Sequence, residues 1–113
     1  MFFRDVVRIT EKDLTAIRSS ASWKGRVAAA HTIPREERAD NEYKFAPERF
    51  RELTVPTLLM LGGESPAFMR KATELVHGAL ENSRIVVMPG QRHTAMNTAP
   101  ELFAAEVLKF LSQ

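Results

Sequence analysis

The sequence of 113 residues contains no cysteine and only one tryptophan and one tyrosine. Without cysteine the chain has no disulfide framework, no thiolate metal ligand and no thiol nucleophile, which fits a reducing cytoplasm. Its apolar runs are short, such as the stretch from Leu58 to Leu61, whereas a membrane-spanning helix needs about 20 apolar residues. No secretory signal is visible, because Arg4 and Asp5 lie close to the first residue. We therefore expect a cytoplasmic protein without a membrane-spanning segment.

The sequence also has no block of charge of one sign. The 16 lysine and arginine residues and the 14 aspartate and glutamate residues are interspersed, as in the stretch 35–38, and the net charge is +2. Proteins that bind nucleic acid usually gather basic residues on one face, so we expect no nucleic-acid partner. A helix-turn-helix over 11–45 is only a distant alternative, because Glu36 and Glu37 would face the phosphates. The 3 histidines have no i, i+4 spacing, so we expect no metal and no cofactor.

What is present divides the chain into two parts of different character. Residues 1–53 are rich in charge and have the periodicity of short amphipathic helices. We expect a first helix capped by Thr10, a second over 21–32, a third over 34–43 and a short turn over 47–50. This part is therefore predicted to contain helices and no strand.

Residues 54–113 have a different hydrophobic pattern. The stretch 55–61 is a continuous apolar run that ends in two glycines, and 84–88 is a second run rich in β-branched residues. Such runs are typical of parallel strands that are buried on both faces. Helical patterns follow both runs, over 66–80 and from about residue 98 onward. The order strand, helix, strand, helix predicts an α/β fold with two parallel strands joined by a right-handed crossover.

Local signals mark the ends and the faces of these two helices. Ser65 precedes Pro66 as a predicted cap, and Thr98 and Glu101 have the spacing of a capping box. The predicted buried faces are Phe68, Ala72, Leu75, Val76 and Ala79 on the first helix and Phe103, Val107, Phe110 and Leu111 on the second.

Two strands that are apolar on both faces make an incomplete sheet. Parallel sheets almost always contain more strands, because an open strand edge promotes aggregation. We therefore expect the remaining strands to come from an N-terminal portion outside these 113 residues or from a second chain, for example in a homo-oligomer. An unusual small fold is the alternative.

The carboxyl ends of the two predicted strands carry the residues best suited to chemistry. Gly62, Gly63 and Glu64 follow the first strand, and the stretch 89–93, with His93 at its end, follows the second. Neighbouring strands lie about 4.8 Å apart, and open α/β proteins bind ligands at this edge of the sheet. We therefore expect Glu64 and His93 to meet. A carboxylate beside an imidazole orients the ring and stabilises the imidazolium that forms during proton transfer.

The same residues also have purely structural interpretations. Glu64 can interact with the dipole of the helix that follows it, and His93 can be an ordinary loop histidine. Ser65 is expected to be a cap rather than a nucleophile. His31 shares a predicted helix face with Trp23, where it either packs or lines a substrate pocket.

Three segments of the sequence resemble the C-terminal part of an α/β-hydrolase. They are 55–66 and 83–93, which look like the last two sheet strands with the catalytic-histidine loop, and 99–111, which looks like the closing helix. The more charged first part of the chain is similar to the cap that covers the active site in many members. The resemblance implies an α/β fold that contains the C-terminal part of an α/β-hydrolase sheet.

The resemblance also implies a division of the chain and roles for its residues. Residues 1–53 would form a helical cap or lid, and residues 54–113 the C-terminal lobe. His93 would be the general base, and Glu64 a candidate acid of the catalytic triad.

The sequence departs from the family pattern in three respects. Glycines occur only at positions 25, 62, 63, 78 and 90, so the nucleophile elbow G-x-S-x-G is absent. Members often have glycine before the catalytic histidine, where this chain has Arg92, and the family acid is more often aspartate than glutamate. Triad chemistry therefore needs a nucleophile from outside these residues.

These observations lead to one main functional hypothesis and one alternative. The first is the C-terminal fragment of a serine-type hydrolase that acts on a small ester- or amide-like molecule, with Trp23, His31 and Tyr43 as candidate walls of the substrate pocket. The alternative is a non-catalytic module of the same fold that binds a hydrophobic ligand or a second chain.

Overall fold

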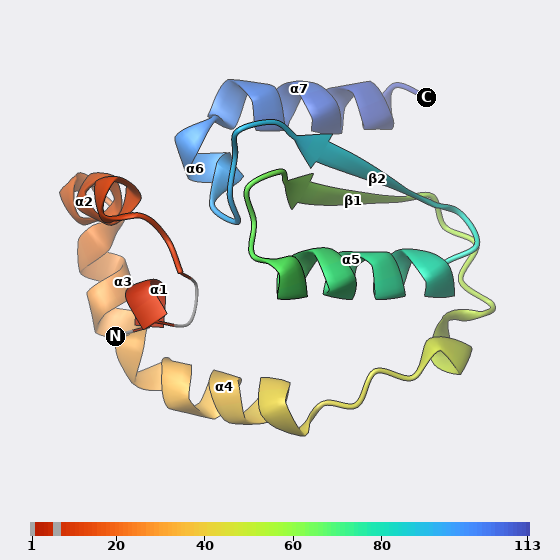
Figure 1. The fold of residues 1–113 in the computed structure, drawn as a ribbon, viewed down its shortest axis with the longest axis horizontal. Coiled ribbons are helices and arrows are strands. Elements are labelled where there is room, and N and C mark those ends of the chain that lie inside the picture. The colour runs from red at the N-terminus through yellow and green to blue at the C-terminus, as the bar shows by residue number, and fades with distance from the viewer. Residues whose placement is uncertain (1, 6–7) are drawn as a thin grey trace.

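The computed structural model describes residues 2–5 and 8–113, and Figure 1 shows their arrangement. The elements in chain order are α1 (Phe2–Asp5), α2 (Glu11–Ser19), α3 (Trp23–Ala29), η1 (Ala30–Thr32), α4 (Ile33–Glu42), η2 (Pro47–Phe50), β1 (Thr57–Gly62), α5 (Ala67–Ala79), β2 (Ser83–Met88), α6 (Ala95–Thr98) and α7 (Pro100–Leu111).

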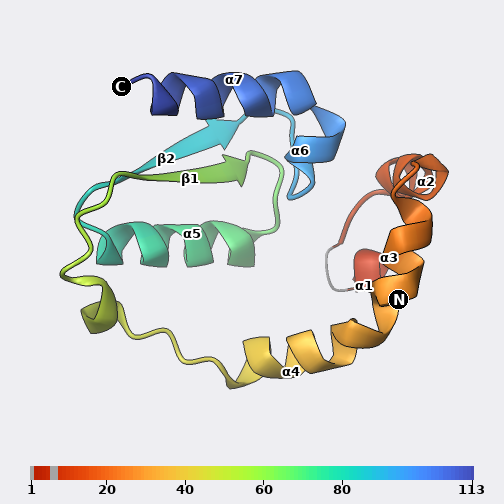
Figure 2. The same ribbon diagram turned by 180° about the vertical axis from the view of Figure 1, so that it is seen from behind.

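The two strands pair in parallel, as the apolar runs predict. Thr57 lies opposite Ser83, and the ladder runs without a break to Gly62 opposite Met88. Helix α5 connects the strands and lies on one side of the sheet, while α7 lies on the opposite side in both views (Figures 1 and 2). The predicted α/β arrangement of two parallel strands with flanking helices is confirmed, and it brings both strand ends to one edge.

The outer edge of β1 is open. In a parallel ladder, alternate residues bond to the same neighbour, and the N–H of Thr57 bonds to the carbonyl of Asn82 at 2.9 Å. The backbone groups of Leu58 and Met60 therefore point away from β2. Within residues 2–5 and 8–113 no third strand pairs with this edge, so β1 offers a template for further strand pairing.

The N-terminal helices form an arc beside the sheet and pack around a small core. Ile9, Leu14 and Ile17 are its buried residues, with Phe3 and Trp23 packed against them. In both views α4 and η2 lead from this arc back to β1 (Figures 1 and 2). This part is helical, as its periodicity predicts.

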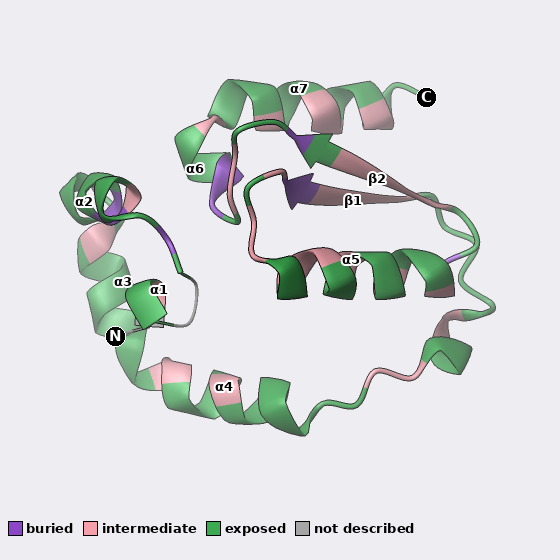
Figure 3. Ribbon diagram, in the orientation of Figure 1, coloured by how far each residue is buried: buried purple, intermediate pink, exposed green. Residues whose placement is uncertain are grey.

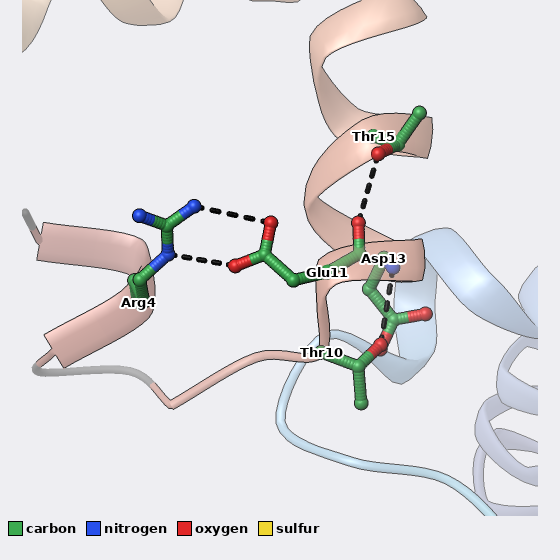
Figure 4. Close-up of polar contacts among 5 residues, drawn as sticks. All are labelled: Arg4, Thr10, Glu11, Asp13 and Thr15. Carbon is green, nitrogen blue, oxygen red and sulfur yellow. Dashed lines mark hydrogen bonds and ion pairs between the residues drawn. The ribbon is translucent and has the colours of Figure 1, made fainter.

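Polar contacts hold the start of α2 (Figure 4). The hydroxyl of Thr10 accepts a hydrogen bond from the N–H of Asp13 at 3.1 Å, which confirms the predicted cap. Arg4 donates through Nε and Nη2 to Glu11, at 2.7 and 3.1 Å, and these hydrogen bonds hold the pKa of Glu11 below its usual value. A lowered folded-state pKa means that the pair stabilises the fold above the ordinary glutamate pKa and loses this effect as the pH falls through the folded-state value. Both side chains are exposed, so the effect is small.

Three predictions about helix boundaries are wrong. The helix expected over 21–32 breaks after Ala29 into a 3₁₀ turn, so His31 does not continue the face of Trp23. Ser65 is not a cap, because α5 starts one residue later with Pro66 as its N-cap and the Ser65 hydroxyl has no partner.

The predicted capping box at the last helix does not form either. Thr98 ends the short helix α6, and its hydroxyl donates to the side-chain oxygen of Gln91 at 2.7 Å. Helix α7 begins two residues later, at Pro100, after an Ala99 that makes no side-chain cap. Its partner Gln91 lies in the histidine loop, a few residues earlier in the chain, and the capping-box spacing does not reveal this contact.

The predicted apolar faces of α5 and α7 are only partly covered. The exposed fractions of Phe68 and Leu75 are 52% and 61%, and that of Leu111 is 72%. Most of the ribbon is exposed or half-buried (Figure 3). The total accessible surface is 8333 Å², whereas a compact monomer of 12.8 kDa exposes roughly 6,300 Å². The radius of gyration of 15.7 Å also exceeds the value of about 13 Å typical of a compact chain of about 100 residues.

The excess of accessible surface, together with the exposed apolar side chains of α5 and α7, predicts self-association of the 113-residue chain. We expect oligomers at micromolar concentration in analytical ultracentrifugation, because apolar area left in water costs about 25 cal/mol per Å². Leu75→Glu places a charge on the exposed face of α5 and should weaken association several-fold. The control Lys71→Glu, at an exposed polar position of the same helix, should change it little. A monodisperse wild-type monomer that melts cooperatively would contradict the expectation.

No helix in the described ranges 2–5 and 8–113 combines the length and the apolar character that crossing a membrane requires.

Candidate functional site

The site is built where the two strands end. The N–H of Gly63 donates to the carbonyl of Met88 at 2.9 Å, which extends the ladder one step past β1. The N–H of Glu64 then donates to the carbonyl of Gln91 at 2.8 Å. The loop after β1, which carries Glu64, and the loop after β2, which carries His93, are therefore joined through their backbones.

Gly62 allows these loops to approach so closely. A Cβ atom at this position would lie 2.6 Å from the carbonyl oxygens of both Gln91 and Arg92, closer than real Cβ contacts. Gly90, in the same loop, has a φ of +66°, a conformation that glycine adopts without strain. Only glycine at position 62 lets the histidine loop rest on the end of β1.

His93 lies in the turn that leads into α6. The N–H of Ala95 closes this turn on the carbonyl of Arg92 at 3.1 Å. The His93 side chain is exposed, and it lines a cavity of about 310 Å³ between β1, α5 and α7. The apolar wall of this cavity includes Met60, Leu61, Met69, Ala72, Met88, Ala95, Met96 and Phe103. An accessible imidazole next to an apolar cavity is suited to proton transfer with a bound small molecule.

Glu64 is close to His93 in the backbone but faces a different space. Its exposed side chain lines a cavity of about 260 Å³ together with Lys12, Asp13 and Arg92. No hydrogen bond joins the Glu64 and His93 side chains in the part of the chain that the structure describes. The structure therefore brings the two loops together but does not pair the carboxylate with the imidazole.

Two hydroxyl groups near His93 are buried without a partner. They are Ser65 Oγ, which belongs to a residue lining the His93 cavity, and Thr94 Oγ1, whose residue is only 7% exposed. A buried hydroxyl without a hydrogen bond costs about 1–3 kcal/mol, so such groups are available to a ligand. The Ser65 hydroxyl can contribute a polar contact to a molecule in this cavity.

Arg92, which replaces the glycine that the resemblance to α/β-hydrolases implies, has an ordinary backbone conformation and adds a contact. Within the described residues Arg8 is the one non-glycine residue with a positive φ, so the backbone at Arg92 does not need glycine. Its Nη1 donates to the carbonyl of Arg8 at 3.1 Å. The side chain thus links the histidine loop to the segment before α2.

The three candidate substrate walls do not share one cavity. Trp23 is half-buried and lines a separate cavity among the N-terminal helices. His31 is exposed, and its Nδ1 lies 2.9 Å from the carbonyl of Ala28 within its own turn. Tyr43 is 56% exposed at the end of α4. In this structure none of the three lines the His93 cavity.

The described residues contain no group of three or more histidine, aspartate or glutamate side chains placed to hold a metal ion.

Two residues that matter for the site were not identified as such from the sequence. The sequence predicts Gly62 only as the end of a strand, although a glycine pair directly after a strand often marks a close approach of another backbone. In the sequence Arg92 is only a departure from the family pattern. Its bond to Arg8 spans 84 residues of sequence, and no local signal could have indicated it.

Comparison with known proteins agrees with this geometry. No family model matches the chain, and no curated protein matches it either. Among solved structures, the chain is similar to an α/β hydrolase from Sphaerobacter thermophilus, with a TM-score of 0.72 and 28% sequence identity. The match covers 97% of this chain and 42% of that chain, so this chain spans less than half the length of the hydrolase. The chain has an α/β-hydrolase-like fold, as its resemblance to that family implies.

Proposed function

We propose that the chain acts as the C-terminal part of a serine-type α/β-hydrolase that cleaves a small ester- or amide-like substrate. In this proposal His93 is the general base, and the nucleophilic serine lies outside the 113 residues. The observation that carries the proposal is the position of His93: its loop is fixed on the end of a parallel strand, and its imidazole lines an apolar cavity.

The open edge of β1 and the exposed apolar faces support the part of the proposal that places the nucleophilic serine outside the 113 residues. A nucleophile elbow follows a strand of the same sheet in this fold, so the part that supplies the serine would also supply strands next to β1. The N–H and C=O groups of Leu58 and Met60 would then complete their hydrogen bonds. The excess accessible surface of the chain would be covered at the same time.

The chemistry assigned to this chain is proton transfer. His93 would accept the proton of the serine as it attacks the carbonyl carbon, and would return it to the leaving group when the acyl-enzyme forms. Glu64 is the candidate carboxylate that orients the ring, a role that requires its side chain to turn from the cavity of Lys12 and Asp13 toward His93. The cavity beside His93 would hold the apolar part of the substrate.

Labelling with a fluorophosphonate tests this proposal, because the reagent reacts with serines that a neighbouring base activates. The 113-residue chain alone should stay unlabelled and should not hydrolyse a generic aryl ester above background. The complete protein, expressed with the polypeptide that its reading frame encodes upstream, should be labelled on a serine outside residues 1–113. Labelling of Ser65 in the isolated chain, or hydrolysis by the complete protein that survives His93→Ala, would contradict the proposal.

The alternative function is a non-catalytic module of the same fold. It is favoured by the separation of Glu64 from His93, which leaves the imidazole without an orienting carboxylate in this structure. A complete protein that binds small apolar molecules in the His93 cavity, but shows neither labelling nor ester turnover, would support this alternative.

A further inference from the structure

A second cavity lies among the N-terminal helices and shares no lining residue with the His93 cavity. It has a volume of about 280 Å³, near the lower end of the range of about 300–1,000 Å³ typical of small-molecule sites. Its lining residues come from the helices at the N-terminal end of the chain: Phe3, Arg4, Leu14, Arg18, Trp23, Arg26, Val27, Ala30 and Ile33. Apolar side chains and arginines make up this lining, and none of the described residues that form it is acidic.

The wall of the cavity is aromatic and aliphatic. The rings of Phe3 and Trp23 lie with their centroids 6.5 Å apart and their planes at 39°. Leu14 is buried beneath them, whereas Val27 is 56% exposed. An alkyl chain that enters this space would cover apolar surface that the helices leave open, which favours binding by about 25 cal/mol per Å².

The guanidinium groups of two arginines lie near the aromatic rings of this wall. The Cζ atom of Arg18 lies 5.9 Å from the centroid of the Trp23 ring, and that of Arg26 lies 5.9 Å from the centroid of the Phe3 ring. A guanidinium that contacts a ring through its face keeps the N–H groups of its edge for other acceptors. Arg26 uses its Nε for a long contact of 3.4 Å with a serine hydroxyl.

Neither Arg18 nor Arg26 forms an ion pair among the described residues, although the charge of Arg18 contributes to the lowered pKa of Glu11, and Asp13 lines a small neighbouring cavity with Arg26. Arg4, the third arginine of the lining, is paired with Glu11 through two hydrogen bonds. A carboxylate is the planar acceptor that a guanidinium edge binds best, with two parallel hydrogen bonds. The cavity therefore combines an apolar interior with two arginines that form no ion pair among the described residues.

We propose that this cavity binds a small apolar monocarboxylate, of about the size of octanoate. The alkyl chain lies against Phe3, Trp23 and Leu14, and the carboxylate accepts hydrogen bonds from Arg18 and Arg26. This site is separate from the His93 cavity and does not depend on hydrolysis by the protein.

Fluorescence titration of the 113-residue chain tests the proposal, because Trp23 is its one tryptophan and lines the cavity. Octanoate should change the emission of Trp23 in a saturable manner, and it should bind at least tenfold more tightly than 1-octanol. Arg18→Met and Arg26→Met keep the apolar stem and should each weaken octanoate binding at least tenfold while octanol binding stays the same. The control Arg38→Met removes a cation from α4 that does not line the cavity, and should leave both affinities unchanged.

Three results of this titration would contradict the proposal. Equal affinities for octanoate and octanol would overturn it, as would unchanged octanoate binding in both arginine variants or no saturable response to octanoate. Far-UV circular dichroism shows whether each variant keeps its helices. If Arg26→Met unfolds the chain, Arg26→Lys replaces it, since this change keeps the charge but removes the paired donors and should still weaken octanoate binding.

Discussion

Replacement of His93 by alanine should lower kcat of the complete protein by about 10⁴-fold or more, if His93 is the general base that we propose, and should leave KM within a few-fold of its original value. His93 is assigned the proton transfers of both half-reactions, and removal of a triad base costs several orders of magnitude in the rate. Its exposed side chain carries little of the packing, so the free energy of unfolding should change little. Steady-state kinetics on an aryl ester, together with urea denaturation, measure both quantities.

The same assay separates the base from its candidate acid. Glu64→Gln keeps the size of the side chain and removes its charge. If Glu64 turns toward His93 in the complete protein, kcat should fall by roughly 10²–10⁴-fold, in line with the loss of a group that orients the base. An unchanged kcat in Glu64→Gln would assign the acid to another residue and leave the role of His93 intact. A rate that survives in His93→Ala would remove the general base from this chain.

Gly62→Ala should destabilise the fold by about 3 kcal/mol and displace the histidine loop. The added Cβ would lie 2.6 Å from two backbone carbonyl oxygens, which cannot move aside as a flexible side chain does. The loop must therefore shift, and a displacement of about 1 Å in a catalytic group costs roughly 100-fold in rate. Urea denaturation of the chain at low concentration measures the first effect, and kcat of the complete protein measures the second.

Gly78→Ala is the matched control for this experiment. A Cβ at Gly78 would meet nothing within 4 Å, and the residue lies within helix α5. The same substitution should therefore stabilise the chain, by up to about 1 kcal/mol, because alanine has the higher helix propensity. Equal effects of the two substitutions would show that the approach of the histidine loop to Gly62 does not constrain the fold.

The order and the direction of the strands could be predicted because they depend on patterns within short windows. A short continuous apolar run that is bounded by turn residues indicates a strand of a parallel sheet, and a helix between two such runs makes them parallel. From this topology we predict contact between Glu64 and His93, but the structure brings together only their loops, because the two side chains line different cavities. Their backbones are joined through the bond from Glu64 to Gln91.

The predictions that were wrong concern side chains whose surroundings depend on how loops and helices pack. Thr98 has the spacing of a capping residue, yet its hydroxyl bonds to Gln91 because the histidine loop folds back against α6. Phe68 and Leu75 have the spacing of a buried face but are exposed, since periodicity indicates which face is apolar and not whether anything covers it.

The amino-acid sequence by itself determined the helical first part, the two parallel strands and the loops that carry Glu64 and His93, because local periodicity and strand composition specify these features. Only the tertiary structure decided that the two side chains line different cavities, that Gly62 supports the histidine loop, and that Arg18 and Arg26 line the same apolar cavity. The reason is physical: distances between side chains of different elements depend on how the elements pack, and packing is set by contacts between residues that are remote in the sequence.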